Sequence, residues 1–139
     1  RTLWLTRPSA FSGRRENLRG SKILLVGMAY KRDLPDERES PGLKVAELLL
    51  REGADVFYHD PFVPRTCVNT TTVHSRAEAV ELVSQTLDKN TIRKADMVII
   101  TTDHSSIDYE NTVRMAETVL DTRNITGRLG MSSGSVFVL

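Results

Sequence analysis

The feature that most constrains the fold is a strand, helix and strand pattern in fewer than 40 residues. The first strand is predicted at Lys22 to Val26, an apolar run closed by Gly27, as expected of a central parallel strand buried on both faces. The second strand is predicted at Asp55 to His59 and is stopped by Asp60-Pro61. Such a βαβ unit is almost always right-handed, which fixes the side of the sheet on which the helix packs.

Capping residues and an apolar face define the helix between these strands. Ser40 supplies an N-cap and Pro41 an N1 proline, and the helix is expected to end at Gly53. Its apolar residues cover one broad face: Leu43, Val45, Ala46, Leu48, Leu49 and Leu50. We expect that face to pack against the sheet.

The second half repeats the alternation of strand and helix. Asp96 to Thr102 is the strongest strand signal in the chain because it is rich in β-branched residues. A short helix is predicted around Asp108 to Ala116, then a strand at Thr118 to Leu120 and a last one at Val136 to Leu139. The pattern predicts an α/β, three-layer, Rossmann-like domain with a mostly parallel sheet.

The middle of the chain allows two interpretations. Arg76 to Val83 is helical by composition, or Val80 to Val83 is a short extended stretch and Ser84 caps a helix that runs through Lys94. The sequence fits both alternatives, with element boundaries that can shift by several residues, and both stay open.

Composition excludes several classes of protein. With 139 residues, 40% hydrophobic and 27% charged, the chain has the size and composition of one globular domain. Its apolar runs of four or five residues are far below the ~20 that a membrane helix needs, so we expect a soluble, cytoplasmic protein without membrane contact. Cys67, the one cysteine, cannot form an internal disulfide or a thiolate metal cluster, and we expect an inert thiol in a loop.

Basic residues gather at the amino terminus. Residues 1 to 22 carry six Lys or Arg and one Glu, although the formal charge of the whole chain is +1. No aromatic interleaving or recognition helix follows, so a solvated linker is favoured over nucleic-acid binding. Because position 1 is Arg rather than Met, we expect residues 1–20 to be a linker from missing upstream domains and residues 21–139 to form the domain.

Functional residues are expected where strands end, because open α/β sheets bind ligands outside the carboxyl ends of their strands. Four segments compete for this role: Gly27 to Ser40, His59 to Pro64, Thr101 to Ser106, and Asp121 to Asn124.

The first of these segments lacks the glycines of a dinucleotide-binding turn. Met28 and Tyr30 stand where a close backbone approach to a pyrophosphate would need glycine, so an anion would have to be bound by side chains and the helix N-terminus. Lys31, Arg32 and Arg38 are available for this, which favours a phosphate or diphosphate. The alternative is that these cations pair with the acidic residues of the same loop and contribute little.

The other strand ends carry weaker signals. Asp60 could accept ribose hydroxyls, but an Asp-Pro turn is favoured. His104 stands where a general base could act, but a capping or hydrogen-bonding role is favoured because no nucleophile is near in sequence. Arg123 follows a short strand and could reach the same crevice as Lys31.

Taken in order, these motifs resemble the C-terminal domain of the UDP-glucose/GDP-mannose dehydrogenase family. The resemblance runs from about residue 21 to 124 and rests on the following pieces: Gly27-Met28-Ala29-Tyr30-Lys31, the spacing of Asp36, Arg38, Ser40 and Pro41, Gly53-Ala54, Tyr58-His59-Asp60-Pro61, Thr102-Asp103-His104-Ser105, Asp108-Tyr109, and Asp121-Thr122-Arg123-Asn124. Residues 1 to 20 and 125 to 139 match poorly. In style the motifs are more similar to UDP-N-acetylglucosamine and UDP-N-acetylmannosamine 6-dehydrogenases than to animal UDP-glucose dehydrogenases.

The resemblance implies a reaction that this domain would not perform alone. Family members oxidise the C6 alcohol of a UDP-sugar to a carboxylate in two NAD-dependent steps, for polysaccharide biosynthesis. Their catalytic cysteine and most of their NAD contacts lie in upstream domains of the same chain, which would be the partners of this domain. The full-length protein would be a homo-oligomer. The domain itself would cover the sugar nucleotide, with UDP-N-acetylhexosamine favoured, UDP-glucose next, and GDP-mannose left open.

The resemblance also implies roles for four residues, none of them catalytic and none a metal ligand. Tyr30 and Lys31 resemble contacts to the uridine and phosphates, and Arg123 resembles a second contact to the UDP moiety. Arg38 resembles the arginine that reaches the cofactor phosphates. Two other functions stay open: a non-catalytic nucleotide-binding or interaction module, and a receiver domain with Asp60 or Asp103 as phosphoacceptor, against which the basic first loop argues.

Overall fold

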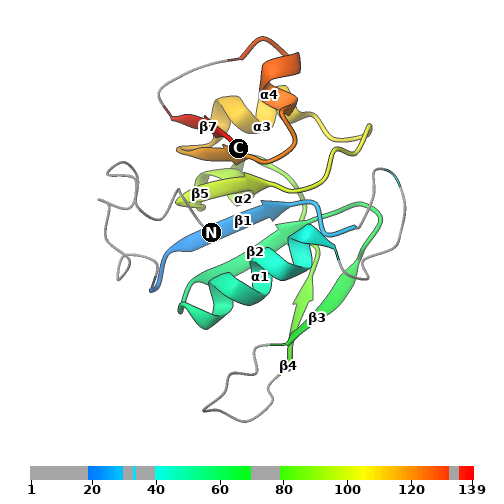
Figure 1. Cartoon of the computed structure of the whole chain (residues 1–139), viewed down its shortest axis with the longest axis vertical. Coiled ribbons are helices and arrows are strands. Elements are labelled where there is room, and N and C mark those ends of the chain that lie inside the picture. Colours follow the sequence, from blue (N-terminus) through cyan, green and yellow to red (C-terminus); the bar gives the residue numbers. More distant parts are fainter. Residues whose placement is uncertain (1–18, 30–32, 34–39, 70–78, 132–134) are drawn as a thin grey trace.

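A computed structural model describes residues 19–29, 33, 40–69, 79–131 and 135–139 (Figure 1). Its main feature is a five-stranded sheet with the order β2-β1-β5-β6-β7, in which every pair is parallel. The strands of the sheet are β1 (Lys22–Val26), β2 (Asp55–His59), β5 (Met97–Ile100), β6 (Val119–Asp121) and β7 (Val136–Val138). The predicted parallel sheet is therefore confirmed.

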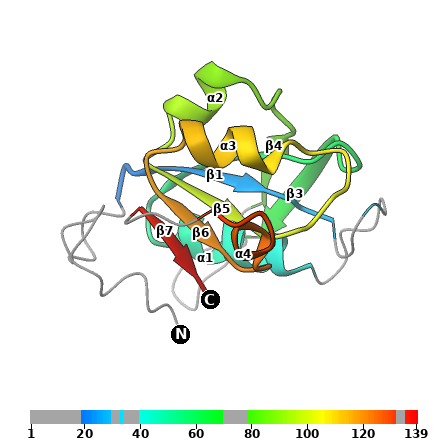
Figure 2. The same ribbon diagram turned by 90° about the horizontal axis from the view of Figure 1, so that it is seen from above.

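Helices cover both faces of the sheet. They are α1 (Pro41–Arg51), α2 (Lys89–Arg93), α3 (Tyr109–Met115) and α4 (Ile125–Arg128). Figure 2 shows α1 on one side of the sheet and α2 and α3 on the other. Each side has its own apolar cluster, because alternate residues of β1 point to opposite faces: Ile23 and Leu25 pack with α1, and Leu24 and Val26 pack with α2 and α3. The predicted three-layer arrangement is confirmed. None of the described helices has the length and apolarity that crossing a membrane requires.

The start of α1 is the one the sequence predicts. The Ser40 hydroxyl accepts a hydrogen bond from the Leu43 N–H at 2.9 Å, and Pro41 occupies the first turn. Satisfying an otherwise unpaired N–H in this way stabilises a helix by about 1 kcal/mol. The helix ends at Arg51, one turn before the strand β2.

The middle of the chain corrects two predictions. Cys67, expected in a loop, lies in β3 (Arg65–Asn69), which pairs antiparallel with β4 (Ala79–Val83) in a separate two-stranded sheet. The extended alternative for Val80 to Val83 is therefore right. The helix after it begins at Lys89 and not at Ser84, because Asp88 accepts from the Thr91 N–H and the Ser84 hydroxyl accepts from the Asp60 N–H instead.

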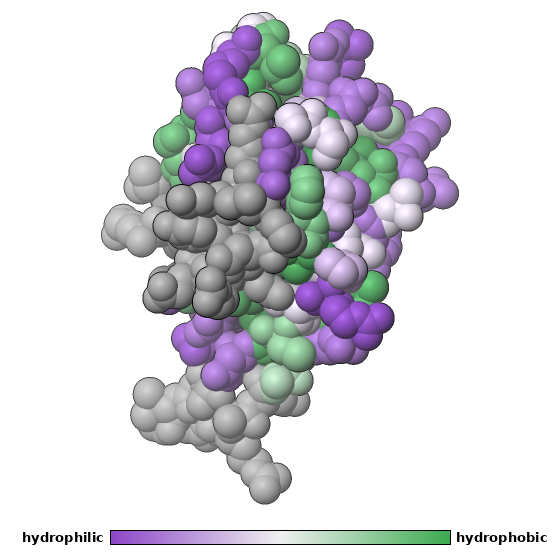
Figure 3. Space-filling model, turned by 90° about the vertical axis from the view of Figure 1, so that its right-hand side faces the viewer, coloured by the Kyte–Doolittle hydropathy of each residue, from purple (hydrophilic) through white to green (hydrophobic). Residues whose placement is uncertain are grey.

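Two glycines allow the end of β1 to lie close to its neighbours. Gly27 has φ +116°, and a Cβ there would come within 2.5 Å of the Thr102 side chain. A Cβ on Gly42 would come within 2.5 Å of the Gly27 carbonyl oxygen, so α1 approaches the β1 turn at a distance only glycine permits. Because the strands are parallel, all these turns lie at the carboxyl edge of the sheet. Figure 3 looks onto that edge, where the described surface mixes hydrophilic and hydrophobic side chains.

Candidate functional site

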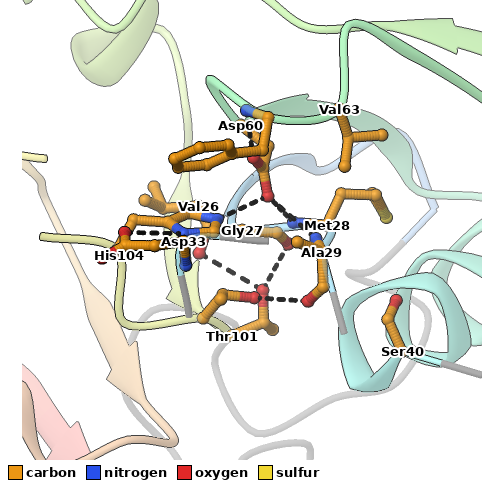
Figure 4. A network of polar contacts seen from close by, with 12 residues as sticks. Val26, Gly27, Met28, Ala29, Asp33, Ser40, Asp60, Val63, Thr101 and His104 are labelled. Atoms are coloured by element: carbon orange, nitrogen blue, oxygen red, sulfur yellow. Dashed lines mark hydrogen bonds and ion pairs between the residues drawn. The ribbon is translucent and has the colours of Figure 1, made fainter. Parts of the chain in front are cut away.

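The buried carboxylate of Asp60 is the centre of the carboxyl edge. Its Oδ2 accepts hydrogen bonds from the Met28 N–H at 2.7 Å and the Ala29 N–H at 2.8 Å, both in the turn that follows β1 (Figure 4). Its Oδ1 accepts from the Phe62 N–H at 2.7 Å. The predicted turn role of Asp60 is thus confirmed, and a second role is added: the carboxylate takes the two N–H groups that a glycine-rich turn would offer to a phosphate.

His104, in the loop after β5, extends this contact to a third segment. Its Nε2 lies 2.8 Å from Asp60 Oδ2, and its Nδ1 accepts a hydrogen bond of 2.8 Å from the Asp33 N–H. Because a backbone N–H can only donate, Nδ1 carries no proton, and Nε2 of the neutral ring donates to the carboxylate. The prediction of a hydrogen-bonding histidine is confirmed.

Asp33 is held by its side chain as well as by its backbone. Its carboxylate accepts from the Ser105 N–H at 2.9 Å and from the Ser105 hydroxyl at 2.8 Å. Its φ is +56°, a left-handed conformation that aspartate tolerates better than most residues. The contacts of Asp33 therefore join the β1–α1 connection to the loop after β5.

Three further side chains support the same turn. The Thr101 hydroxyl donates to the Gly27 carbonyl at 2.6 Å, and the Thr102 hydroxyl donates to the Ala29 carbonyl at 3.0 Å. The Tyr109 hydroxyl donates to the Thr102 carbonyl at 2.7 Å and accepts from the His104 N–H at 2.8 Å. Burial raises the pKa of the Tyr109 phenol, so it stays protonated and keeps donating.

The charge of Asp60 is stabilised where it lies. Burial alone raises the pKa of this carboxyl, but the hydrogen bonds from Met28, His104 and Ala29 outweigh burial and hold the pKa below its ordinary value. Asp60 is therefore a buried anion at neutral pH, with a full set of protein donors. A ribose hydroxyl would have to displace one of them.

Arg123 lies at the next strand end of the same edge. It follows β6 and is exposed, and its N–H donates to Asp121 Oδ1 at 3.0 Å. The same carboxylate accepts from the Thr126 N–H at 2.7 Å and from the Thr126 hydroxyl at 2.6 Å. The turn that carries Arg123 is thus fixed by its own aspartate. Tyr30, Lys31 and Arg38, the other three predicted site residues, lie outside the described residues.

A pocket of about 320 Å³ opens between the β5–α3 loop, α3 and α4. His104 and Ser105 form one wall. Ile125 of α4 and Leu129, which follows the C-terminal end of α4, form another. Arg128 in this pocket pairs with Asp103 at 2.6 Å. The pocket therefore adjoins the Asp60 network through His104, and Arg123 is not among its lining residues.

The described residues do not form a dinucleotide or metal site of the usual kind. The turn after β1 does not fit a cofactor pyrophosphate, because Asp60 already uses its N–H groups and Met28 and Ala29 carry side chains. Within the described ranges no three His, Cys, Asp or Glu residues converge as metal ligands. Cys67 is exposed on β3, on a different sheet from the network.

Sequence reasoning missed the connection between Asp60, His104 and Asp33. Each was considered by itself, and their separations of 44 and 71 residues hide the contact. The available signal was position: Asp60 and His104 follow strands that both pair with β1, and Asp33 follows β1 itself.

Comparison with known proteins shows which family and which solved structures this domain is similar to. Residues 24–128 match the family model described as "UDP-glucose/GDP-mannose dehydrogenase family, UDP binding domain". UDP-glucose 6-dehydrogenase of Rattus norvegicus is 32% identical over 97 residues, which are 64% of this chain and 20% of that protein. UDP-N-acetyl-D-mannosamine dehydrogenase of Pyrococcus horikoshii is 30% identical over 108 residues, 74% of this chain and 22% of that protein.

Solved structures are similar over most of the chain. The native UDP-N-acetyl-mannosamine dehydrogenase of Staphylococcus aureus matches with a TM-score of 0.57 and 25% identity, over 87% of this chain and 26% of that one. An NDP-N-acetyl-D-galactosaminuronic acid dehydrogenase of Methanosarcina mazei shares the fold with a TM-score of 0.59 at 23% identity, over 91% of this chain and 25% of that one. The chain thus spans about a fifth to a quarter of the proteins it matches.

Proposed function

The chain belongs to the UDP-glucose/GDP-mannose dehydrogenase family, and from that premise we propose that it is the nucleotide-binding, C-terminal part of an NAD-dependent UDP-sugar 6-dehydrogenase. The observation that carries the proposal is the continuous match of residues 24–128 to the family's UDP-binding domain. In this proposal the chain binds UDP-sugar, and the oxidation and most NAD contacts belong to upstream domains of the same protein.

Four residues have proposed roles. Tyr30 and Lys31 contact the uridine and phosphates of the substrate, Arg123 makes a second contact to the UDP moiety, and Arg38 reaches the cofactor phosphates. Support comes from the exposure of Arg123 at the carboxyl edge of the sheet, where α/β domains bind ligands. Arginine and lysine give diphosphates charge-assisted hydrogen bonds, which are about twice as strong as neutral ones.

We propose UDP-N-acetylhexosamine as the substrate, with UDP-glucose next. The Ala-Tyr-Lys segment and the Thr-Asp-His-Ser segment support this order. The relatives include enzymes of both names at similar identity, 32% for UDP-glucose 6-dehydrogenase and 30% for UDP-N-acetyl-D-mannosamine dehydrogenase. Substrate choice therefore needs a direct comparison.

The test is an assay of the full-length protein that carries this chain. We expect NAD to be reduced when UDP-N-acetylmannosamine or UDP-N-acetylglucosamine is added, more slowly with UDP-glucose, and least with GDP-mannose. NADH absorbance measures the rates. UDP binding by calorimetry without NAD reduction by any of these sugars would instead support a non-catalytic nucleotide-binding module.

Replacement of Lys31 tests the site. Removing a phosphate-binding cation costs about 1.5 to 3 kcal/mol, so Lys31→Ala should raise the KM for the UDP-sugar roughly 10 to 150-fold. Lys89→Ala is the matched control, because Lys89 is an exposed lysine at the start of α2 with no proposed role in nucleotide binding. An unchanged KM in Lys31→Ala would contradict the proposed role.

A further inference from the structure

One buried pair of side chains holds the backbone on both sides of residues 30–32. On the side of Ala29, the N–H donates to Asp60 Oδ2 at 2.8 Å. On the side of Asp33, the N–H donates to His104 Nδ1 at 2.8 Å. Asp60 and His104 contact each other at 2.8 Å, so three hydrogen bonds in series join Ala29 to Asp33.

Neither side chain of this pair is open to solvent. Both side chains have 0% exposure, and their polar atoms are used by protein donors and acceptors. Phe62 packs near the His104 ring, with the ring centroids 4.9 Å apart. Any effect of Asp60 or His104 on binding must therefore act through the backbone that they hold.

Such an effect is expected from the cost of ordering a loop. Fixing one residue's backbone costs about 1 to 2 kcal/mol, and a protein that fixes its binding segment before the ligand arrives avoids this loss on binding. Ala29 and Asp33 leave only three residues between them, and two of those are Tyr30 and Lys31. The hydrogen bonds to Asp60 and His104 hold the two residues that flank these three.

We propose that Asp60 and His104 are positioning residues for nucleotide binding, which set the two ends of the segment that carries Tyr30 and Lys31. This inference rests on the proposed function, because it assumes that Tyr30 and Lys31 contact the nucleotide. The neutral His104 ring is essential to it, because Nε2 donates to Asp60 while Nδ1 accepts from the Asp33 N–H.

Two substitutions of His104 separate its two contacts in the full-length protein. His104→Gln keeps a donor near Asp60 and loses the acceptor for the Asp33 N–H, whereas His104→Asn keeps the acceptor and loses the donor. We expect each to raise the KM for the UDP-sugar about 10-fold, with kcat and the KM for NAD within about 3-fold of wild type. Asp88→Ala is the control: it removes the side chain that accepts from the Thr91 N–H at the start of α2 and takes no part in the contacts of Asp60, His104 and Asp33, so both KM values should stay unchanged.

A second readout does not depend on the nucleotide. Amide hydrogen exchange should become faster at Asp33 in His104→Gln and at Met28 and Ala29 in His104→Asn. Faster exchange at Asp33 with an unchanged KM for the UDP-sugar would overturn the positioning role while leaving the proposed function intact. Wild-type protein that neither binds UDP nor oxidises a UDP-sugar would overturn the proposed function, and the positioning role with it.

Ser105→Ala covers the case in which the His104 variants do not fold. Ser105 is exposed, and its hydroxyl donates to the Asp33 carboxylate, so its loss loosens the same end of the segment without opening the core. We expect a rise in the KM for the UDP-sugar of about 3-fold and no change in kcat. No rise in KM, together with faster exchange at Asp33, would again contradict the proposal.

Discussion

Two strands of the sheet end beside a buried aspartate, and the two carboxylates bind different kinds of partner. Asp60 after β2 accepts from donors in the β1 turn and in the β5 loop, which are 31 to 44 residues away in sequence. Asp121 at the end of β6 accepts from Arg123 and Thr126, which are two and five residues ahead in sequence. One carboxylate joins three strand ends, and the other closes its own turn.

The comparison shows that similar burial does not mean a similar function in the fold. Both side chains are 1% exposed or less, and hydrogen bonds hold the pKa of both carboxyls low against the opposing effect of burial. Asp60, however, contributes to long-range structure at the proposed binding edge, whereas Asp121 fixes the local turn that presents Arg123. Deleting each one should therefore have different consequences.

Asp60→Ala should have the largest effect. It leaves three N–H groups and the His104 ring without their acceptor in a buried place, and breaking such a contact costs about 3 to 5 kcal/mol. Urea denaturation followed by circular dichroism measures the free energy of unfolding. Asp60→Asn is the control, because it keeps one acceptor oxygen and should cost less. A loss below about 1 kcal/mol in Asp60→Ala would show that the network does not stabilise the fold.

Asp121→Ala should cost less, about 2 kcal/mol, because its donors lie in one short turn that can move toward water. Amide exchange should become faster in α4 and stay unchanged at Met28 and Ala29. If Asp121→Ala destabilised the protein as much as Asp60→Ala, or if its effect on exchange reached the β1 turn, the distinction between the two carboxylates would be wrong.

The local part of this architecture could be predicted from the sequence. The strand before Gly27 and the helix capped by Ser40 depend on neighbouring residues, and both are where they were predicted. The parallel sheet and the hydrogen-bonding role of His104 were predicted as well. These features follow from apolar patterning, capping and strand-end position, which a short window of sequence contains.

Features that depend on distant partners could not be predicted. β3 was missed because only Thr66 and Val68 point inward, which leaves a strand with no continuous apolar run. Ser84 was the helix cap in one of the two alternatives for the middle of the chain, but its hydroxyl accepts from the Asp60 N–H instead. In both of these cases tertiary contacts decide between local alternatives. The α4 helix was missed for another reason: it has only four residues, and its N-cap Asn124 is in the left-handed conformation and makes no side-chain capping bond.

Protonation of both carboxylates at low pH should destabilise the protein less than their replacement by alanine, because the protonated side chain stays in place. The folded protein holds the pKa of Asp60 and of Asp121 below the ordinary value of 3.8. As the pH falls, these carboxyls therefore bind protons at a higher pH in the unfolded chain than in the folded protein. Their contribution to the free energy of unfolding is fully present above about pH 4 to 5 and is lost as the pH drops through the lowered pKa values. Urea denaturation from about pH 2 to pH 6 measures the slope of the unfolding free energy against pH. Asp60→Asn and Asp121→Asn should each flatten it, and an unchanged slope in either variant would mean that its carboxyl titrates alike in both states.

Thr126→Val should have the smallest effect and sharpens the comparison most directly. It replaces the hydroxyl that donates to Asp121 at 2.6 Å by a methyl group of similar size, and the N–H donors of Thr126 and Arg123 remain. Loss of one hydrogen bond to a charged acceptor that keeps two others should cost about 1 to 1.5 kcal/mol of unfolding free energy.

Ser84→Ala is the matching substitution beside Asp60. The Ser84 hydroxyl accepts from the Asp60 N–H and donates to the Asp60 carbonyl, and these two bonds join the end of β4 to the end of β2. Because its two partners belong to a contact between separate sheets, Ser84→Ala should destabilise the protein at least as much as Thr126→Val and should speed amide exchange in β4. The reverse order would mean that the local turn at Asp121, and not the long-range contacts around Asp60, carries more of the stability of this edge.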